Sequence, residues 1–104
     1  MIVEQRDYQI HTGKLNELVG HYEAEGIVLQ QRYLGTLVGA FTTEVGGLST
    51  YTHMWAYESF EERMRRRAEL QADEGWRAFL AKVQPLIQSQ RNRILIPTSF
   101  SPLR

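Results

Sequence analysis

The sequence predicts an α+β fold with the element order β-α-β-β-α-β. Four short stretches are rich in β-branched or aromatic residues, and the first of them also has the period-two spacing that is typical of β-strands. Two longer regions repeat apolar residues every three or four positions, which is typical of amphipathic helices. Glycine and proline residues lie between these stretches, where turns are needed. This order of elements predicts the ferredoxin-like fold, in which a four-stranded antiparallel sheet carries both helices on one face.

Four strands are expected, and each combines β-branched or aromatic residues with turn residues at its ends. They cover residues 2–10, 36–44, 49–57 and 93–96. The pair Gly46-Gly47 predicts that the second and third strands form a hairpin. The alternation of the first strand places three polar or aromatic residues on one face, namely Glu4, Arg6 and Tyr8. The third strand separates its large side chains from its small ones, the large ones being Tyr51, His53, Trp55 and Tyr57.

Two helical regions are expected between the strands. Thr12 is the expected N-cap of the first region, and Gly26 is expected to interrupt it. Ser59 and Glu62 have the spacing of a capping box and predict the start of the second region. Asp73 is expected to cap a continuation of that helix, before a proline near its end.

Length and composition restrict the classes of function. A chain of 104 residues has the size of one domain, so residues 1–104 are expected to form a single domain. The net charge is zero, whereas binding to nucleic acid calls for a basic excess, so no nucleic-acid partner is expected. Cysteine is absent, which excludes disulfides and thiolate chemistry. No apolar run has the length of a membrane span or a signal peptide, so we expect no membrane partner and a cytoplasmic location.

The aromatic content of the sheet favours a homodimer. Helices cover one face of a ferredoxin-like sheet and leave the other face open. Four aromatic residues of the second and third strands cannot all face water without a larger apolar patch than monomers usually expose. They are Phe41, Tyr51, Trp55 and Tyr57. A second copy packed sheet against sheet would cover them, so we expect Trp55 and Tyr57 in a symmetric interface.

Four stretches resemble the NIPSNAP family, a branch of the dimeric α/β-barrel proteins. They are IVEQRDYQIHTGKLNEL, LQQRYLGTLVGAFTTEVG, THMWAYESFEERMRRR and RILIPTSFSP, and they occur in the right order over nearly the whole chain. The resemblance implies a ferredoxin-like subunit whose sheet faces that of a second copy to form a barrel. It implies no catalytic residues. Structural relatives in the same superfamily include monooxygenases that need neither metal nor flavin, but that likeness is one of fold alone.

Polar residues on two neighbouring strands predict a site at the sheet. The first and third strands are adjacent in this topology, so their polar faces can meet. Imidazole exchanges a proton near neutral pH, and arginine or tyrosine can hold a carboxylate, enolate or phenolate. The candidate catalytic residues are therefore His53 as a base, with Arg6 or Tyr57 as orienting groups. The candidate ligand-binding residues are Glu4, Tyr8, Tyr51, Trp55 and Arg32.

Several of these residues also have a purely structural interpretation. His53 can be a hydrogen-bonded spacer, Glu4 and Arg6 can form an ion pair, and Arg32 can cap the helix that carries it. A run of arginines follows the third strand, namely Arg63, Arg65, Arg66 and Arg67. Glu61 and Glu62 precede two of them by four residues, which predicts a salt-bridged, solvated helix face rather than an anion site.

The leading functional hypothesis is a dimeric domain that binds a small molecule in a cleft at the sheet, without a cofactor. One alternative is a cofactor-free enzyme of the monooxygenase or isomerase kind, with His53 as the base. The other is a protein-interaction module that uses the outer helices and the tail. The three histidines lie on separate elements without a metal-binding motif, so no metal site is expected. Phe100 and Leu103 of the tail are expected to pack against the subunit or its partner.

Overall fold

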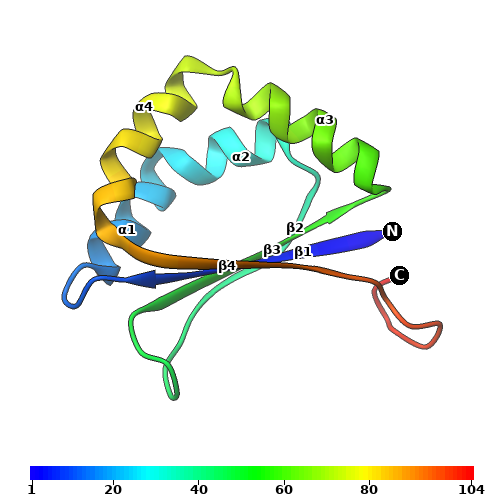
Figure 1. The fold of residues 1–104 in the computed structure, drawn as a ribbon, viewed down its shortest axis with the longest axis horizontal. Coiled ribbons are helices and arrows are strands. Elements are labelled where there is room, and N and C mark those ends of the chain that lie inside the picture. The colour runs from blue at the N-terminus through cyan, green and yellow to red at the C-terminus, as the bar shows by residue number, and fades with distance from the viewer.

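The computed structural model describes residues 1–104 as a twisted sheet with helices packed on one side (Figure 1). The strands are β1 (Ile2–Ile10), β2 (Thr36–Thr42), β3 (Thr50–Tyr57) and β4 (Ile87–Leu95). The α-helices are α1 (Leu15–His21), α2 (Ile27–Tyr33), α3 (Phe60–Gln71) and α4 (Glu74–Val83). A π-helical turn, η1 (Tyr22–Gly26), joins α1 to α2, and a 3₁₀ turn, η2 (Gln84–Leu86), precedes β4.

The sheet has the strand order β2-β3-β1-β4, and every neighbouring pair is antiparallel. The predicted ferredoxin-like fold is therefore confirmed, including the hairpin of β2 and β3. The helices lie over one face of the sheet, and the other face carries no helix (Figure 1). None of the helices is long and apolar enough to cross a membrane.

β1 and β3 pair in a register that brings the predicted polar residues together. The three pairs that matter for the site are Glu4 with Trp55, Arg6 with His53, and Tyr8 with Tyr51. All six side chains are buried on the face that the helices cover. The intervening residues of both strands point to the open face, because side chains alternate along a strand.

The burial of the aromatic residues corrects the interface prediction. Trp55 has no exposed surface in the single chain, and Tyr51 and Tyr57 are buried with it in the core beneath the helices. Placing Trp55 and Tyr57 in a dimer interface was therefore wrong, because the helices of the same subunit already cover the odd-numbered positions of β3. Of the four aromatic residues expected at the interface, only Phe41 projects from the open face, with 55% of its surface exposed.

The helix starts after β3 agree with the predicted caps. Ser59 Oγ accepts a hydrogen bond from the backbone N–H of Glu62 at 3.1 Å, and α3 begins at the next residue after Ser59. Asp73 Oδ1 accepts one from the N–H of Trp76 at 3.0 Å at the start of α4. Each cap satisfies an N–H that lacks a partner within its helix.

The first helical region differs from the prediction at two places. Thr12 does not cap α1, because Gly13 turns the chain with a φ of 83° and the helix begins only after Lys14, without a side-chain cap. Gly26 does not end the helical region either, since α2 continues from it. A Cβ at Gly26 would overlap the ring of Phe79 on α4, so the glycine allows two helices to approach closely.

β4 begins at Ile87, six residues before the strand that the sequence predicted. Residues 88–93 are exposed and polar on both faces, as is common for an edge strand, so they lack the expected alternation. In the tail, Leu103 lines an apolar hollow of about 200 Å³ on the open face with Val3 and Met54, as predicted. Phe100 differs, because 84% of its surface is exposed in the single chain.

Candidate functional site

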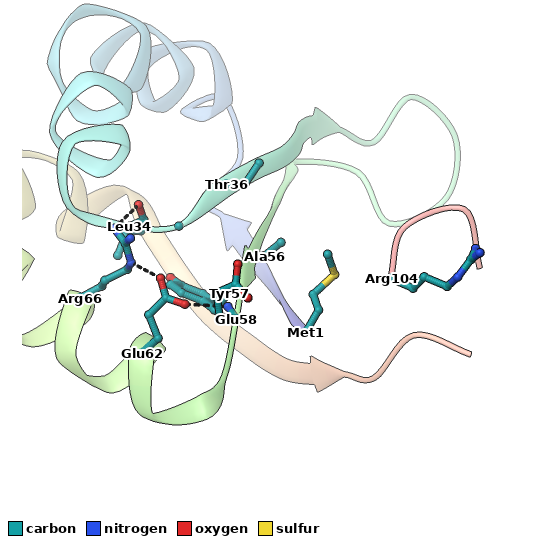
Figure 2. Close-up of a pocket in the computed structure, with 10 residues that line it drawn as sticks. Met1, Leu34, Thr36, Ala56, Tyr57, Glu58, Glu62, Arg66 and Arg104 are labelled. Carbon is teal, nitrogen blue, oxygen red and sulfur yellow. Dashed lines mark hydrogen bonds and ion pairs between the residues drawn. The ribbon is translucent and has the colours of Figure 1, made fainter. Parts of the chain in front are cut away.

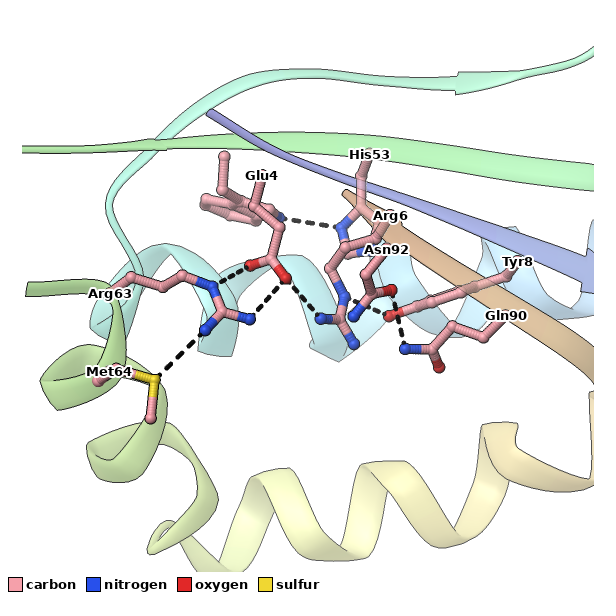
Figure 3. A network of polar contacts seen from close by, with 9 residues as sticks. Glu4, Arg6, Tyr8, His53, Arg63, Met64, Gln90 and Asn92 are labelled. Carbon is pink, nitrogen blue, oxygen red and sulfur yellow. Dashed lines mark hydrogen bonds and ion pairs between the residues drawn. The ribbon is translucent and has the colours of Figure 1, made fainter. Parts of the chain in front are cut away.

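A carboxylate with no exposed surface lies at the centre of the polar cluster on the covered face (Figure 3). Arg63 on α3 donates to both oxygens of Glu4, from Nε at 3.0 Å and from Nη2 at 2.8 Å. Arg6 donates to Glu4 Oε2 from Nη1 at 3.0 Å and to the Tyr8 hydroxyl from Nε at 2.9 Å. The bidentate contact joins α3 to β1 and fixes the helix over the sheet.

These contacts determine the charge of Glu4. Burial disfavours the ionised form, but the hydrogen bonds from Arg63 and the charges of Arg6 and Arg67 outweigh it, so the pKa of Glu4 lies below its usual value. The carboxylate is therefore ionised at neutral pH, with three N–H groups pointing at it. Glu4 acts as a structural anchor rather than as a proton donor.

Arg67 lies one helical turn after Arg63 and differs from it in having no partner. It is half-buried, yet its guanidinium makes no hydrogen bond and no ion pair. Burial and the nearby charge of Arg6 lower the pKa of Arg67, and Glu4 only partly offsets them. The cluster thus combines three arginines with a single carboxylate, which leaves a positive excess at the sheet.

His53 lies in the core with no exposed surface, between the rings of Tyr8, Tyr51 and Tyr22. Its Nδ1 accepts a hydrogen bond from Trp55 Nε1 at 2.9 Å, so the neutral ring carries its hydrogen on Nε2. That Nε2 has no partner. Burial, followed by the charge of Arg6, lowers the pKa of His53 to about 3. The ring is therefore neutral at physiological pH, and it bonds only to a structural group.

A cavity of about 180 Å³ lies between β1, β4 and the helices, and we name it the helix–sheet cavity. Its charged lining residues are Arg6 and Arg67, and no acidic residue lines it. Gln30, which is only 2% exposed, also lines it, and the Oε1 atom of this residue has no hydrogen-bond donor. The other lining residues are apolar or neutral: Tyr8, Tyr22, Gln71, Trp76, Leu80, Val83, Gln84, Ile87 and Gln90.

A second cavity, of about 520 Å³, lies where α3 and the end of β3 meet the start of β2, and we name it the edge cavity (Figure 2). The charged residues that α3 contributes to this cavity pair with each other. Arg66 binds Glu62 and also donates to the carbonyl of Leu34 at 3.3 Å. Tyr57 lines it as well, and burial raises the pKa of Tyr57 to about 12. The paired charges give this cavity no excess of either sign on its helix side.

The structure brings together most of the predicted site residues. Six of them meet beneath the helices: Glu4, Arg6, Tyr8, Tyr51, His53 and Trp55. Only Arg6 and Tyr8 of these line the helix–sheet cavity. Tyr57 lines the edge cavity instead, and Arg32 is exposed at the end of α2, where it lines neither cavity. No group of three His, Cys, Asp or Glu side chains is placed to hold a metal ion.

The arginine run divides into two sets that sequence reasoning had treated as one. Arg66 pairs with Glu62 as predicted, and Arg65 pairs with Glu69 at 3.2 Å rather than with Glu61. Arg63 and Arg67 turn toward the sheet instead. Their spacing of four residues places them on one helix face. A buried acid such as Glu4 needs a cationic partner, and this need was the available indication that the arginine face points inward. The sequence gives no comparable indication that Gln30, Tyr22 and Trp76 line a cavity.

Residues 3–102 match the family model described as NIPSNAP. NipSnap homolog 1 from Danio rerio is 36% identical over 103 residues, which are 99% of this chain and 36% of that protein. This chain thus spans about a third of the length of that curated relative. A crystal structure of a NIPSNAP family protein from Agrobacterium tumefaciens is 48% identical, with a TM-score of 0.97 over 99% of this chain and 98% of that one.

A more distant likeness concerns the fold alone. The structure of a putative antibiotic biosynthesis monooxygenase from Nitrosomonas europaea has a TM-score of 0.70 at 9% identity, over 93% of this chain and 98% of that one. At that identity the two chains share an architecture, and the likeness carries no information about chemistry.

Proposed function

The chain belongs to the NIPSNAP family, and we propose that it binds a small molecule in the helix–sheet cavity. The observation that carries this proposal is Gln30, a lining residue of the cavity whose buried Oε1 has no hydrogen-bond donor. Leaving such a group unsatisfied costs about 1–3 kcal/mol, and native structures seldom do so. A ligand that donates a hydrogen bond to Gln30 would remove this cost.

The size and walls of the cavity support a ring-shaped ligand. Its volume of about 180 Å³ slightly exceeds that of an apolar cavity of ~150 Å³ that is known to hold benzene. Tyr8, Tyr22 and Trp76 contribute aromatic walls. Ligand pockets typically combine apolar and aromatic walls with a few polar groups that fix orientation.

The cavity is also accessible from outside. Three of its lining residues are exposed, namely Gln71, Gln84 and Gln90. They belong to the end of α3, to η2 and to β4, so they mark a mouth between the helices and the edge strand. A ligand can enter there without unfolding the core.

The test is a thermal-shift screen of the purified protein against a metabolite panel. A ligand of the native state raises the apparent melting temperature, by an amount that grows with ligand concentration. We expect the hits to lose their effect in Gln71→Trp, because an indole at the mouth would block the cavity. Ala78→Trp is the matched control, since Ala78 is exposed on α4 and does not line the cavity. Hits that shift both variants equally would place the binding elsewhere and contradict the proposal.

We further propose that the protein is a homodimer that pairs through the open sheet face. Trp55 lies beneath the helices and takes no part in this interface. Support comes from Phe41, which is exposed on that face, and from the apolar hollow formed there by residues such as Val3, Met54 and Leu95. Sedimentation equilibrium over a hundred-fold range of concentration tests it. A single species of 12.1 kDa at every concentration would contradict it.

The two alternatives gain less support from the geometry. An enzyme with His53 as its base needs a free lone pair, but the lone pair on Nδ1 accepts from Trp55, and the neutral ring carries its hydrogen on Nε2. An interaction module needs an extended apolar patch on the outer helices, but Trp76 and Phe79 are buried, and the exposed apolar side chains there are Phe60 and Met64 on α3 and Val28 on α2. The cytoplasmic location stays a prediction.

A further inference from the structure

We propose that the ligand of the helix–sheet cavity is a small organic anion, a ring that bears a carboxylate, and that Arg67 binds this carboxylate with Arg6 beside it. The inference rests on the proposed function, because it assigns a chemical class to the ligand of the same cavity. Two observations carry it, the unpaired guanidinium of Arg67 and the buried amide oxygen of Gln30.

The charges around the cavity are unbalanced. Arg63 and Arg6 share Glu4, which leaves Arg67 with no acceptor of its own. Neither the lining of the cavity nor the polar cluster beside it contains a further carboxylate. A half-buried cation without a partner is costly, and an anion in the cavity would neutralise it where water screens little.

The comparison of Arg63 with Arg67 indicates what each of them does. Both project from α3 toward the sheet, one helical turn apart, and both feel the charge of Glu4. Arg63 makes a bidentate contact with this carboxylate, which is the geometry that a guanidinium prefers. Arg67 lines the cavity without such a partner, so a second carboxylate is the group that would complete it.

Gln30 adds a requirement at another point of the ligand. Its Oε1 accepts hydrogen bonds only, so the ligand must present an O–H or N–H there. An aromatic ring is the scaffold that we infer between these two groups, since the remaining walls include Tyr22 and Trp76. Hydroxybenzoates have this chemistry, and the matching hydroxybenzamides have the same shape without the charge.

The first experiment needs no ligand. The melting temperature of Arg67→Met should lie within about 2 °C of that of the wild-type protein, or above it, because the removed charge has no partner. Arg63→Met should lower it by at least about 10 °C, because Glu4 loses a bidentate contact. An equal loss in both variants would mean that Arg67 has a structural role and would overturn the proposal.

The second experiment measures binding directly by calorimetry, with 2-, 3- and 4-hydroxybenzoate and the three hydroxybenzamides. We expect at least one acid to bind about ten-fold or more tightly than its amide. In Arg67→Met this ratio should fall to about two-fold, whereas Arg65→Met, which removes an exposed charge, should keep it. Quenching of tryptophan fluorescence, with Trp76→Phe as a control, would locate the bound ring.

The outcomes separate the two proposals. Binding of amides as tightly as acids, or no binding of any acid at millimolar concentration, overturns the charge assignment. If neutral metabolites still stabilise the protein and lose this effect in Gln71→Trp, the cavity remains a binding site for another class of ligand. If the acids bind equally well to Gln71→Trp, both the site and its assignment are wrong.

Discussion

The two faces of the sheet use the same strands in opposite ways. On the covered face, β1 and β3 place charged and aromatic side chains opposite each other, with Arg6 against His53 at the centre. On the open face, the adjacent pairs are Gln5 with Met54 and Asp7 with Thr52. The buried polar side chains of the covered face thus bond to one another, to neighbouring strand residues and, for Glu4, to Arg63 on α3. A polar side chain is buried here where a hydrogen-bond partner meets it.

The largest difference between the two faces is expected when one acid is removed from each face of β1. Glu4→Ala leaves the buried guanidinium groups of Arg6 and Arg63 without a carboxylate, and we expect a loss of about 3–5 kcal/mol in the free energy of unfolding. Asp7→Ala is the matched control, since Asp7 accepts from Thr52 at 2.6 Å on the half-buried open face. It should lose about 1 kcal/mol.

Urea denaturation at one protein concentration measures both variants. Equal losses for the two would show that the covered face depends no more on its acid than the open face does.

A second prediction concerns the pH dependence of stability. His53 is neutral when folded, with a pKa of about 3, whereas in the unfolded chain its pKa is ~6.5. Below pH ~6.5 the unfolded state therefore binds a proton that the folded state does not, so stability falls as the pH falls. The expected loss is about 2 kcal/mol between pH 7 and pH 5.

His53→Gln should remove most of this loss, because an amide oxygen can still accept from Trp55 and does not titrate. The two proteins should have similar pH profiles above pH 7, where both side chains are neutral. An unchanged slope between pH 7 and pH 5 in His53→Gln would assign the dependence to other groups.

The smallest effect on the folding of the subunit is expected on the open face. Phe41→Lys replaces an exposed side chain, so the free energy of unfolding of the monomer should change by about 0.5 kcal/mol or less. The same variant should weaken the proposed dimer, because each copy would bring an unpaired charge into a desolvated sheet face. Sedimentation equilibrium measures this association. A dimer that is as tight as that of the unchanged protein would exclude Phe41 from the interface.

Much of the covered face could be predicted from the sequence. Alternation in β1 and β3, together with the adjacency of these strands, was sufficient to place Glu4, Arg6 and His53 on one side. The inward face of α3 was predicted only in part, as a stripe of Phe60, Met64, Arg67 or Ala68, and Leu70. Leu70 is buried and Arg67 lines the helix–sheet cavity, but Phe60 and Met64 are exposed and Arg63 turns inward. Helix periodicity finds apolar stripes, whereas a stripe of arginines becomes visible only once a buried acid is known to face it.

The helix–sheet cavity was also beyond sequence reasoning. Gln30 is polar and lies on an amphipathic helix, so its burial depends on how α2 packs against the other helices. The start of β4 was missed for a related reason. Its first half is exposed, and an edge strand that is solvent-exposed on both faces has no alternation of apolar and polar residues that would predict it.

The contact between Gly26 and Phe79 has a mechanical consequence. The ring of Phe79 on α4 packs directly against the backbone of Gly26 in η1, and no other side chain lies between them. Close-packed interiors resist compression, which makes this wall of the protein stiff. We therefore expect a motion that widens the helix–sheet cavity at its exposed rim, where Gln84 and Gln90 lie. Amide hydrogen exchange should be slow around Gly26 and faster along the first half of β4.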